Sequence, residues 1–228
     1  MDPLNMNLFI FGSSGMVGQA ALRAATLDPG VKSITTIVRR SQSPKNSKVK
    51  ELILGNLRDI SKLSSQVAGC DLAIFAVGVT SAGMSEQEYT AFTYGLTIEV
   101  AEAMLKHNKN MKFIYVSGSG ADSSEKGKAM WPRVRGKTEN KILSMGFQDA
   151  YIVRPAVIIP MDEIYSKTTS YRIMYSILKP VLPVFKLVVS NYVTTTRELG
   201  KVFLEVGRKG YSKKILESQD IVALGKTI

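Results

Sequence analysis

The sequence predicts an α/β fold in which helices cover both faces of a parallel sheet. Short apolar runs rich in β-branched residues alternate with helical stretches as far as Pro160, which is typical of strand–helix–strand units. The first apolar run ends in a glycine-rich turn that opens a helix, a common start for such a sheet. With 228 residues, 45% of them hydrophobic, the chain is long enough for one domain with a well-filled core.

The glycine turn lies between the apolar run Leu8–Phe11 and a helix that we expect to end near Thr26. Gly12, Gly15 and Gly18 recur at every third position. Such a turn leaves backbone N–H groups and a helix N-terminus open to a pyrophosphate, because no side chain blocks the approach. The alternative is an ordinary tight turn between a strand and a helix. We predict dinucleotide binding, with contacts from Gly12, Ser13, Ser14, Gly15, Met16 and Val17.

The second strand, expected at Ser33–Val38, ends in Arg39 and Arg40. An acid at this place binds the ribose 2′-hydroxyl of NAD, whereas a basic residue accommodates the 2′-phosphate of NADP. The alternative is a pair of solvated loop arginines. We expect NADP, with NAD as the less favoured cofactor.

The next two strands are expected at Val49–Leu54 and Asp71–Val77, with a short helix at Ser61–Val67 between them. Their carboxyl ends lie at the edge where open α/β sheets bind ligands. Asn56 and Leu57 follow the third strand, where an adenine ring would lie. At the end of the fourth strand, we expect cofactor contacts from Ala76, Val77 and Gly78.

The chain then continues the alternation as far as Pro160. The expected elements are a long helix over Glu86–His107, a fifth strand at Met111–Val116, a helix over Met130–Met145 and a sixth strand at Asp149–Ile159. We expect Phe92 to pack inward on the apolar stripe of the long helix.

Beyond Pro160 the pattern changes. Pro180 and Pro183 forbid one continuous helix over Tyr171–Val189, so we expect a helix, a turn and a short segment that caps the ligand cleft. A membrane-surface anchor is the alternative for this stretch, because aromatic, basic and apolar residues mix there. We also expect a helix with a hydroxyl cap at Arg197–Gly207 and a short strand within Lys213–Leu224. We divide the chain into an NAD(P)-binding core, residues 1–160, and a C-terminal substrate or cap region, residues 161–228, packed on the same domain.

Composition excludes several classes of protein. Cys70 is the sole cysteine and His107 the sole histidine, so an internal disulfide and a His/Cys metal cluster are ruled out. The net charge is +11, but the basic residues are scattered rather than gathered on one helix, so we expect no nucleic-acid partner. The start shows no secretory pattern, and no apolar run is long enough to span a bilayer. We therefore expect a cytoplasmic protein.

Several motifs together resemble the atypical and extended short-chain dehydrogenase/reductase superfamily, in particular small members similar to Tat-interacting protein 30 and NmrA-like proteins. Besides the glycine turn and the arginine strand end, they are Asn56–Asp59, Tyr115–Asp122, Met130–Asn140 and Tyr151–Pro155. The resemblance covers nearly the whole chain. It implies a Rossmann-type fold, a nicotinamide cofactor, oxidoreductase activity and a role for Arg154 and Pro155 in positioning substrate or cofactor. A plain end of the sixth strand is the alternative for Arg154 and Pro155.

The sequence departs from that superfamily at the catalytic pair. Active members use a Tyr and a Lys four residues apart on one helix, and these positions fall on Trp131 and Arg135. An indole N–H exchanges no proton near neutral pH, and an arginine stays charged, so it can hold a ribose or phosphate but not act as a base. A shifted register sets Arg133 against Lys137 and again lacks the tyrosine. Lys137 and Glu139 are expected on a solvated face.

Other residues could take part in the chemistry. Ser117 and Ser119 follow the fifth strand, where a hydroxyl can hydrogen-bond a carbonyl. The remaining candidates are Tyr89, Tyr94 and Asp122. We predict a catalytic set of Ser119, Ser117, Trp131 and Arg135, with no metal, and we also expect cofactor contacts from Arg135 and Pro155.

Three functions follow from these observations. The first is an NADP(H)-dependent oxidoreductase with an altered catalytic site that acts on a small carbonyl or related substrate. The second is a non-catalytic NADP(H)-sensing regulatory or scaffold protein. The third is an assembly factor at a membrane surface, which depends on the 171–189 stretch alone.

Overall fold

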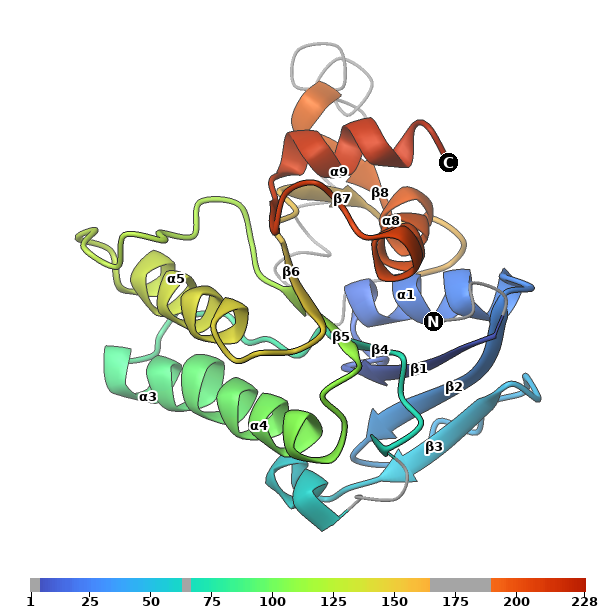
Figure 1. The fold of residues 1–228 in the computed structure, drawn as a ribbon. Coiled ribbons are helices and arrows are strands. Elements are labelled where there is room, and N and C mark those ends of the chain that lie inside the picture. The colour runs from blue at the N-terminus through green and yellow to red at the C-terminus, as the bar shows by residue number, and fades with distance from the viewer. Residues whose placement is uncertain (1–4, 63–66, 165–189) are drawn as a thin grey trace.

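The structure is a computed structural model that describes residues 5–62, 67–164 and 190–228 (Figure 1). Within these residues, seven strands form one sheet in the order β3-β2-β1-β4-β5-β6-β9, and neighbouring strands are parallel. The order reverses between β1 and β4, which confirms the predicted doubly wound, Rossmann-type sheet. The strands are β1 (Met6–Phe11), β2 (Val31–Val38), β3 (Val49–Ile53), β4 (Leu72–Phe75), β5 (Lys112–Val116), β6 (Asp149–Val153) and β9 (Ile215–Leu216).

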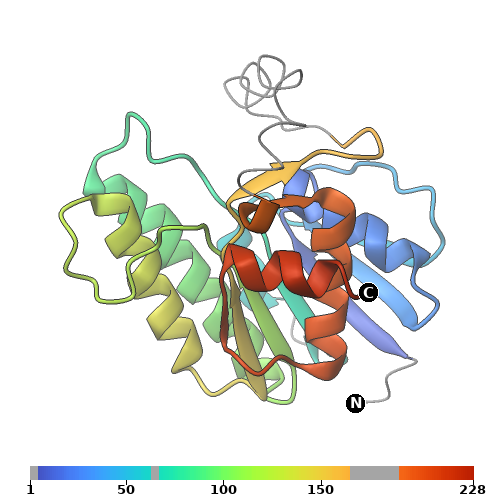
Figure 2. The same cartoon turned by 90° about the horizontal axis from the view of Figure 1, so that it is seen from above.

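Helices cover both faces of this sheet, as the two views show (Figures 1 and 2). On one face lie α1 (Met16–Leu27), α8 (Thr196–Lys209) and α9 (Ser218–Gly225). On the other lie α3 (Glu86–Thr90), α4 (Thr97–His107) and α5 (Met130–Leu143). Because both faces are covered, the central strands are apolar on both sides. In β1, for example, Leu8 and Ile10 face one core, whereas Phe9 and Phe11 face the other.

The predicted long helix forms, but it contains a wider turn. Residues Ala91–Leu96 are π-helical and join α3 directly to α4. The wider turn changes which residues face the sheet, so Thr93 and Leu96 are buried while Phe92 is 39% exposed. The expectation that Phe92 packs inward is therefore wrong.

The predicted sixth strand is two strands. β6 ends at Val153, and Val157–Ile159 forms β7, which pairs with β8 (Val193–Thr195) in a separate two-stranded sheet. Pro155 lies between them and has no N–H to donate to a ladder. The chain therefore leaves the main sheet there and passes over the carboxyl ends of the strands.

The short helix expected at Ser61–Val67 begins earlier. A 3₁₀ helix runs over Leu57–Lys62, and residues 63–66 lie outside the described part of the chain. Asn56 sets the earlier start, because its side-chain oxygen accepts a hydrogen bond from the Arg58 N–H at 3.0 Å. The segment after β3 is thus a capped turn of helix rather than a loop.

The C-terminal residues contribute to the core of the domain. α8 packs closely on α1: a Cβ on Gly200 would lie 2.4 Å from the Ala20 carbonyl oxygen. The predicted hydroxyl cap is Thr195, which forms a capping box with Glu198. The predicted cap over Tyr171–Val189 lies outside the described residues. In the described parts, no helix has the length and hydropathy needed to cross a bilayer.

Candidate functional site

The glycine turn joins β1 to α1, and its three glycines differ in the space around them. Gly12 has a φ of +78°, and a Cβ there would lie 2.6 Å from the Ala76 carbonyl oxygen at the end of β4. A Cβ on Gly18 would lie 2.1 Å from the Gly12 carbonyl oxygen, so this glycine lets α1 pack against the turn. The turn is closed by a 2.9 Å hydrogen bond from the Gly15 N–H to the Gly12 carbonyl. Two of the three positions therefore require glycine for the backbone itself.

Gly15 differs, because its place at the N-cap of α1 leaves the helix terminus open. The nearest atom to a Cβ at Gly15 would be 3.4 Å away, so packing alone permits a small side chain. No side chain caps the helix, and no acidic residue stands in its first turn. The N–H groups of the first turn carry partial positive charge that a phosphate can bind. The uncapped helix terminus is therefore compatible with the pyrophosphate site that the glycine spacing predicts.

Arg39 and Arg40 follow β2 and are both exposed. The loop after them is held by Glu51 of β3, whose carboxylate accepts hydrogen bonds from the Ser41 hydroxyl at 2.5 Å and the Gln42 N–H at 2.8 Å. Glu51 could not be predicted as a loop partner, because it lies on the neighbouring strand, ten residues from Ser41. The Glu51 carboxylate is thus hydrogen-bonded to the loop, and Arg39 and Arg40 are exposed to solvent at the end of β2.

The other predicted cofactor contacts lie at the carboxyl ends of β3 and β4. Asn56 caps the 3₁₀ helix and is exposed, and Leu57 is half-buried against the core. Ala76 and Val77 are half-buried, and Gly78 is exposed. The Ala76 N–H donates to the Phe11 carbonyl at 3.0 Å, which keeps the end of β4 against the glycine turn.

A cleft of about 650 Å³ opens at the carboxyl ends of β4 and β5. It brings together residues that are distant in the sequence: the start of α1, the loops after β4 and β5, the start of α5 and the segment around β7. Of the predicted site residues, it is lined by Met16, Val17, Ser117, Ser119, Trp131, Arg135 and Pro155. It is also lined by Tyr89, which the sequence analysis named only as a further candidate.

Ser117 and Ser119 are positioned by the turn that follows β5. The Ser117 N–H donates to the Val153 carbonyl at 2.9 Å, and the Ser119 N–H donates to the Pro155 carbonyl at 3.1 Å. Ser117 is 7% exposed, and among the described residues its Oγ is the one buried side-chain polar atom without a hydrogen-bond partner. An unsatisfied buried hydroxyl costs about 1–3 kcal/mol. This hydroxyl is therefore left without a hydrogen-bond partner in the described part of the chain, in a residue that lines the cleft.

Arg135 brings a positive charge into the cleft. Its Nε donates to the Tyr89 hydroxyl at 3.1 Å, and its two terminal nitrogens lie 3.9 Å from the positions that a Cβ would take on Gly78 and Gly118. Burial by itself lowers the pKa of Arg135, but neighbouring groups, the Tyr115 and Tyr89 hydroxyls first, leave it above its ordinary value. The guanidinium thus stays charged and lies between the carboxyl ends of β4 and β5.

The two possible positions of the catalytic pair, Trp131 with Arg135 and Arg133 with Lys137, have different surroundings in the structure. Trp131 lies in the cleft, and its ring packs over Gly120, where a Cβ would lie 3.3 Å from the ring. Arg133 instead binds the Glu86 carboxylate at 2.8 Å and two loop carbonyls at 2.6 Å, and Lys137 is exposed over the Tyr94 ring. The register of Trp131 and Arg135 is the one that faces the cleft.

Glu139 was expected on a solvated face, and this is wrong. It is fully buried and forms an ion pair with Arg154 at the end of β6. Arg154 also donates to Glu217 at 2.6 Å and to the Ser123 hydroxyl at 2.6 Å. Burial by itself lowers the pKa of Arg154, but hydrogen bonds and charge from Glu139 and Glu217 raise it. Arg154 thus joins α5, β6 and the C-terminal region, and Pro155 beside it lines the cleft.

Asp122 and Tyr94 are also held elsewhere. The Asp122 carboxylate accepts hydrogen bonds from Ser124 and from the Gly127 N–H at 2.7 Å, and these bonds lower its pKa. Tyr94 lies beneath the ammonium group of Lys137, 4.9 Å from the ring centre. Of the further candidates, Tyr89 alone lines the cleft in the described structure.

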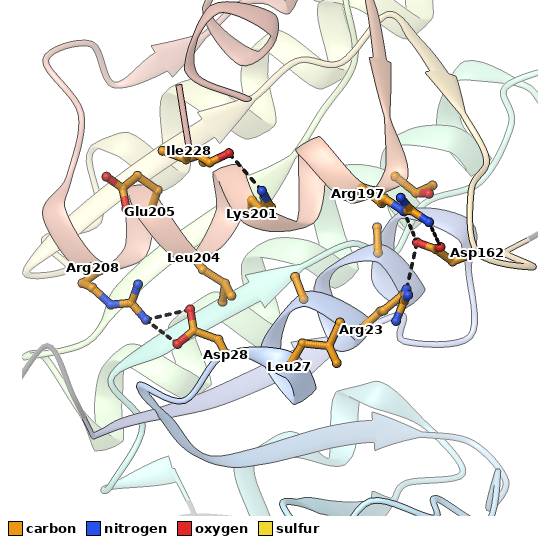
Figure 3. Close-up of a pocket in the computed structure, with 13 residues that line it drawn as sticks. Arg23, Leu27, Asp28, Asp162, Arg197, Lys201, Leu204, Glu205, Arg208 and Ile228 are labelled. Atoms are coloured by element: carbon orange, nitrogen blue, oxygen red, sulfur yellow. Dashed lines mark hydrogen bonds and ion pairs between the residues drawn. The ribbon is translucent and has the colours of Figure 1, made fainter. Parts of the chain in front are cut away.

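A second cavity, of about 440 Å³, lies between α1 and α8 (Figure 3). Its charged side chains are bound to other groups of the chain. Asp162 accepts hydrogen bonds from Arg23 at 2.9 Å and from Arg197 at 2.7 Å, while Arg208 donates to both carboxylate oxygens of Asp28 at 2.9 Å. Lys201 donates to the Ile228 carbonyl at 2.9 Å. None of the predicted site residues lines this groove.

Comparison with known proteins agrees with this geometry. A family model described as NAD(P)H-binding matches residues 12–174. The chain belongs to this NAD(P)H-binding family. It is 27% identical to the mitochondrial protein FMP52 of Candida albicans over 95% of this chain and 94% of that protein, and 31% identical to the protein fmp52 of Aspergillus niger over 67% of this chain and 66% of that protein.

Solved structures share the fold. A short-chain dehydrogenase from Burkholderia cenocepacia in complex with NADP matches with a TM-score of 0.66 at 15% identity, over 98% of this chain and 93% of that chain. A short-chain dehydrogenase/reductase from Saccharomyces cerevisiae matches with a TM-score of 0.65 at 14% identity, over 94% and 96% of the two chains. The fold resemblance to short-chain dehydrogenases/reductases that the motifs indicated is therefore confirmed.

One expectation is overturned by these relatives. The FMP52 proteins of Candida, Aspergillus and Meyerozyma are named as mitochondrial, so the expected cytoplasmic location is wrong. That expectation depended on the single cysteine and the absence of a secretory pattern. Both features speak against an oxidising secretory compartment, but they do not distinguish the cytosol from a mitochondrial compartment.

Proposed function

We propose that this chain is an NADP(H)-dependent oxidoreductase that acts on a small carbonyl or related substrate. The observation that carries the proposal is the shared cleft. Ser117, Ser119 and Arg135 line the same space as Met16 and Val17, the first residues of the helix behind the glycine turn. A cofactor bound at the turn would therefore meet these polar groups.

The residues at the strand ends fit a dinucleotide. The open N-terminus of α1 suits the pyrophosphate, and Arg39 and Arg40 supply charge for a 2′-phosphate. When bound, the nicotinamide supplies or accepts a hydride. The remaining contacts that we assign to the cofactor are Ser13, Ser14, Asn56, Leu57, Ala76, Val77, Gly78 and Pro155.

The polar groups of the cleft suit a substrate oxygen that gains negative charge. The Ser117 hydroxyl has no partner in the described structure and can donate to a carbonyl oxygen, with Ser119 two residues further on. The permanent charge of Arg135 can stabilise the negative charge that develops on that oxygen. Trp131 forms part of the cleft wall.

The cofactor assignment is tested by titrating NADPH and NADH against the fluorescence of Trp131, the sole tryptophan of the chain. We expect NADPH to bind more tightly. Arg39→Asp should weaken NADPH binding about tenfold or more, because it replaces a phosphate partner with a like charge, and leave NADH binding little changed. Lys32→Asp is the matched control, since Lys32 is exposed at the opposite end of β2. Equal affinity for the two cofactors in the wild type would overturn the NADP assignment.

A non-catalytic NADP(H) sensor is the second candidate. It is favoured by Trp131 and Arg135, which stand where active relatives carry a proton-donating pair. A panel of aldehydes, ketones and quinones separates the two functions. NADPH oxidation that exceeds the blank and falls in Ser119→Ala supports the enzyme, whereas tight NADPH binding with no turnover on any substrate supports the sensor.

We also propose that the protein is associated with mitochondria, as the names of its FMP52 relatives indicate for them. Fractionation of yeast cells that express a C-terminally tagged chain tests this. The tag should be enriched with a mitochondrial marker. Recovery with cytosolic markers alone would contradict it.

A further inference from the structure

We propose that Tyr89 is the proton donor of this site and that Arg135 holds it in place, an inference that rests on the proposed oxidoreductase function. Tyr89 comes from α3, whereas the missing tyrosine of the superfamily would stand on α5. The structure joins the two helices through the 3.1 Å hydrogen bond from Arg135 Nε to the Tyr89 hydroxyl. A phenol and a cation are thus paired in the cleft, but the phenol comes from a different helix.

The chemistry of the cleft lining selects Tyr89. Of the described residues that line it, Tyr89 and Arg135 alone carry ionisable side chains. Arg135 does not release its proton in a protein, and Trp131 has only a non-exchanging indole N–H. A serine hydroxyl needs a neighbouring base to act, and this lining has no histidine or carboxylate. Tyr89 therefore carries the one proton that the cleft can give up.

Tyr115 is a second tyrosine close to Arg135, but it is in the wrong place. It lies in β5 and is as deeply buried as Tyr89, but unlike Tyr89 it is not part of the cleft lining. Burial raises its pKa far above the ordinary value, although the charge of Arg135 acts in the opposite direction. Its hydroxyl therefore stays protonated within the core, where a substrate does not reach it.

The start of α3 fixes the position of Tyr89. Ser85 caps this helix, and its hydroxyl and N–H pair with Glu88 in a capping box. The Tyr89 N–H then donates to the Ser85 carbonyl at 3.0 Å. Tyr89 lies in the first turn after the cap and is 1% exposed, so backbone and packing together hold its ring.

These groups can supply the hydride and the proton that reduction of a carbonyl requires. The carbonyl carbon gains a hydride from the reduced nicotinamide, which is the two-electron reductant. The carbonyl oxygen gains the proton of the Tyr89 hydroxyl, so the C=O double bond becomes a C–H and an O–H bond. The tyrosinate that remains lies beside the Arg135 guanidinium, which stabilises its charge, until it regains a proton from water.

The test compares Tyr89→Phe with Tyr94→Phe. Tyr94 lies on the same long helix but beneath Lys137 and outside the cleft lining. We expect Tyr89→Phe to lower kcat about 10²–10⁴-fold, the usual contribution of a positioned acid. NADPH affinity, read from Trp131 fluorescence and independent of turnover, should change less than about twofold. Tyr94→Phe should leave both unchanged.

The outcomes separate the two proposals. An active wild type whose turnover is unaffected by Tyr89→Phe overturns the role of Tyr89 and leaves the oxidoreductase function standing. A wild type that binds NADPH but reduces nothing overturns the function and the proton donor together. If Tyr89→Phe unfolds by circular dichroism, Arg135→Lys replaces it. A lysine keeps the charge, so turnover should stay well above that of Arg135→Met, and equal loss in both would contradict a charge held beside Tyr89.

Discussion

Arg135 lies on α5, and Arg154 contacts the same helix from the end of β6. The two guanidinium groups have different partners. Arg154 ends β6 and is bound by Glu139, Glu217 and the Ser123 hydroxyl. Arg135 lies one helical turn before Glu139 and donates a hydrogen bond to the Tyr89 hydroxyl. Among the described residues no carboxylate hydrogen-bonds Arg135, although the charge of Glu139 contributes to its raised pKa. The charge of the buried Arg154 is balanced by bound carboxylates, whereas Arg135 lines the open cleft without a direct ion pair among the described residues.

The two cavities repeat this difference. In the groove between α1 and α8, Arg23, Arg197 and Arg208 are bound by aspartates (Figure 3). In the cleft at the strand ends, the Ser117 hydroxyl has no hydrogen-bond partner among the described residues, and Arg135 hydrogen-bonds the Tyr89 hydroxyl rather than a carboxylate. Polar groups that satisfy one another stabilise a fold, whereas groups left without a full complement of partners are available to a ligand. We therefore place the site in the cleft.

The largest effect should follow from breaking the Arg154 pair. Arg154→Met leaves the fully buried Glu139 carboxylate without its cation, which should reduce the free energy of unfolding by about 3–5 kcal/mol. Urea denaturation measures this. The double variant Arg154→Met with Glu139→Gln removes both charges and should recover part of the loss. A single-variant change below about 1 kcal/mol would contradict a structural role for the pair.

Arg135→Met should have the opposite profile. It removes a charge without leaving a buried partner charge behind, so urea denaturation should show a change of about 1 kcal/mol or less. Turnover of NADPH with a carbonyl substrate should fall about 100-fold, because the cation next to the reacting oxygen is lost. Lys137→Met, two residues along the same helix and exposed, is the control and should retain full activity. Loss of stability as large as in Arg154→Met would remove the distinction between the two arginines.

Asp162→Asn in the groove should have the smallest effect. Hydrogen bonds from Arg197 and Arg23 hold the pKa of Asp162 well below its ordinary value. The stabilisation is therefore present above about pH 4 and is lost as the pH falls through the folded-state pKa. The melting temperature of Asp162→Asn should lie at most about 3 °C below that of the wild type at pH 7. The difference should shrink in acid, and a constant difference down to pH 3 would contradict the ion pair.

Local patterns predicted most of the fold because they depend on neighbours in the sequence. The glycine spacing, the arginine strand end and the Thr195 cap all follow from residues a few positions apart. The π-helical turn that exposes Phe92 could not be predicted from the spacing of apolar residues, because that spacing assumes a regular α-helix. The sequence shows Pro155, but it does not show that the chain leaves the main sheet there. That path depends on the pairing of β7 with the distant β8.

Single residues of the candidate cleft could be predicted from the sequence, but the contacts between them could not. Ser117, Trp131 and Arg135 were identified because they follow a strand or occupy known helix positions. The partner of Arg135 is Tyr89, 46 residues earlier, and the partner of Glu139 is Arg154, 15 residues later on another element. Such pairs depend on how the elements pack together. A long-range contact has no signature within either segment alone.

The most direct test of the proposed oxidoreductase function follows the transferred hydride. The wild-type protein is incubated with NADPH deuterated at the transferred position of the nicotinamide and with a small ketone, and the alcohol is analysed by mass spectrometry. We predict an alcohol that carries one deuterium on the former carbonyl carbon, and a product yield that collapses in Tyr89→Phe. Saturable NADPH binding with no deuterium in any product would contradict an oxidoreductase and leave a cofactor-binding protein without chemistry.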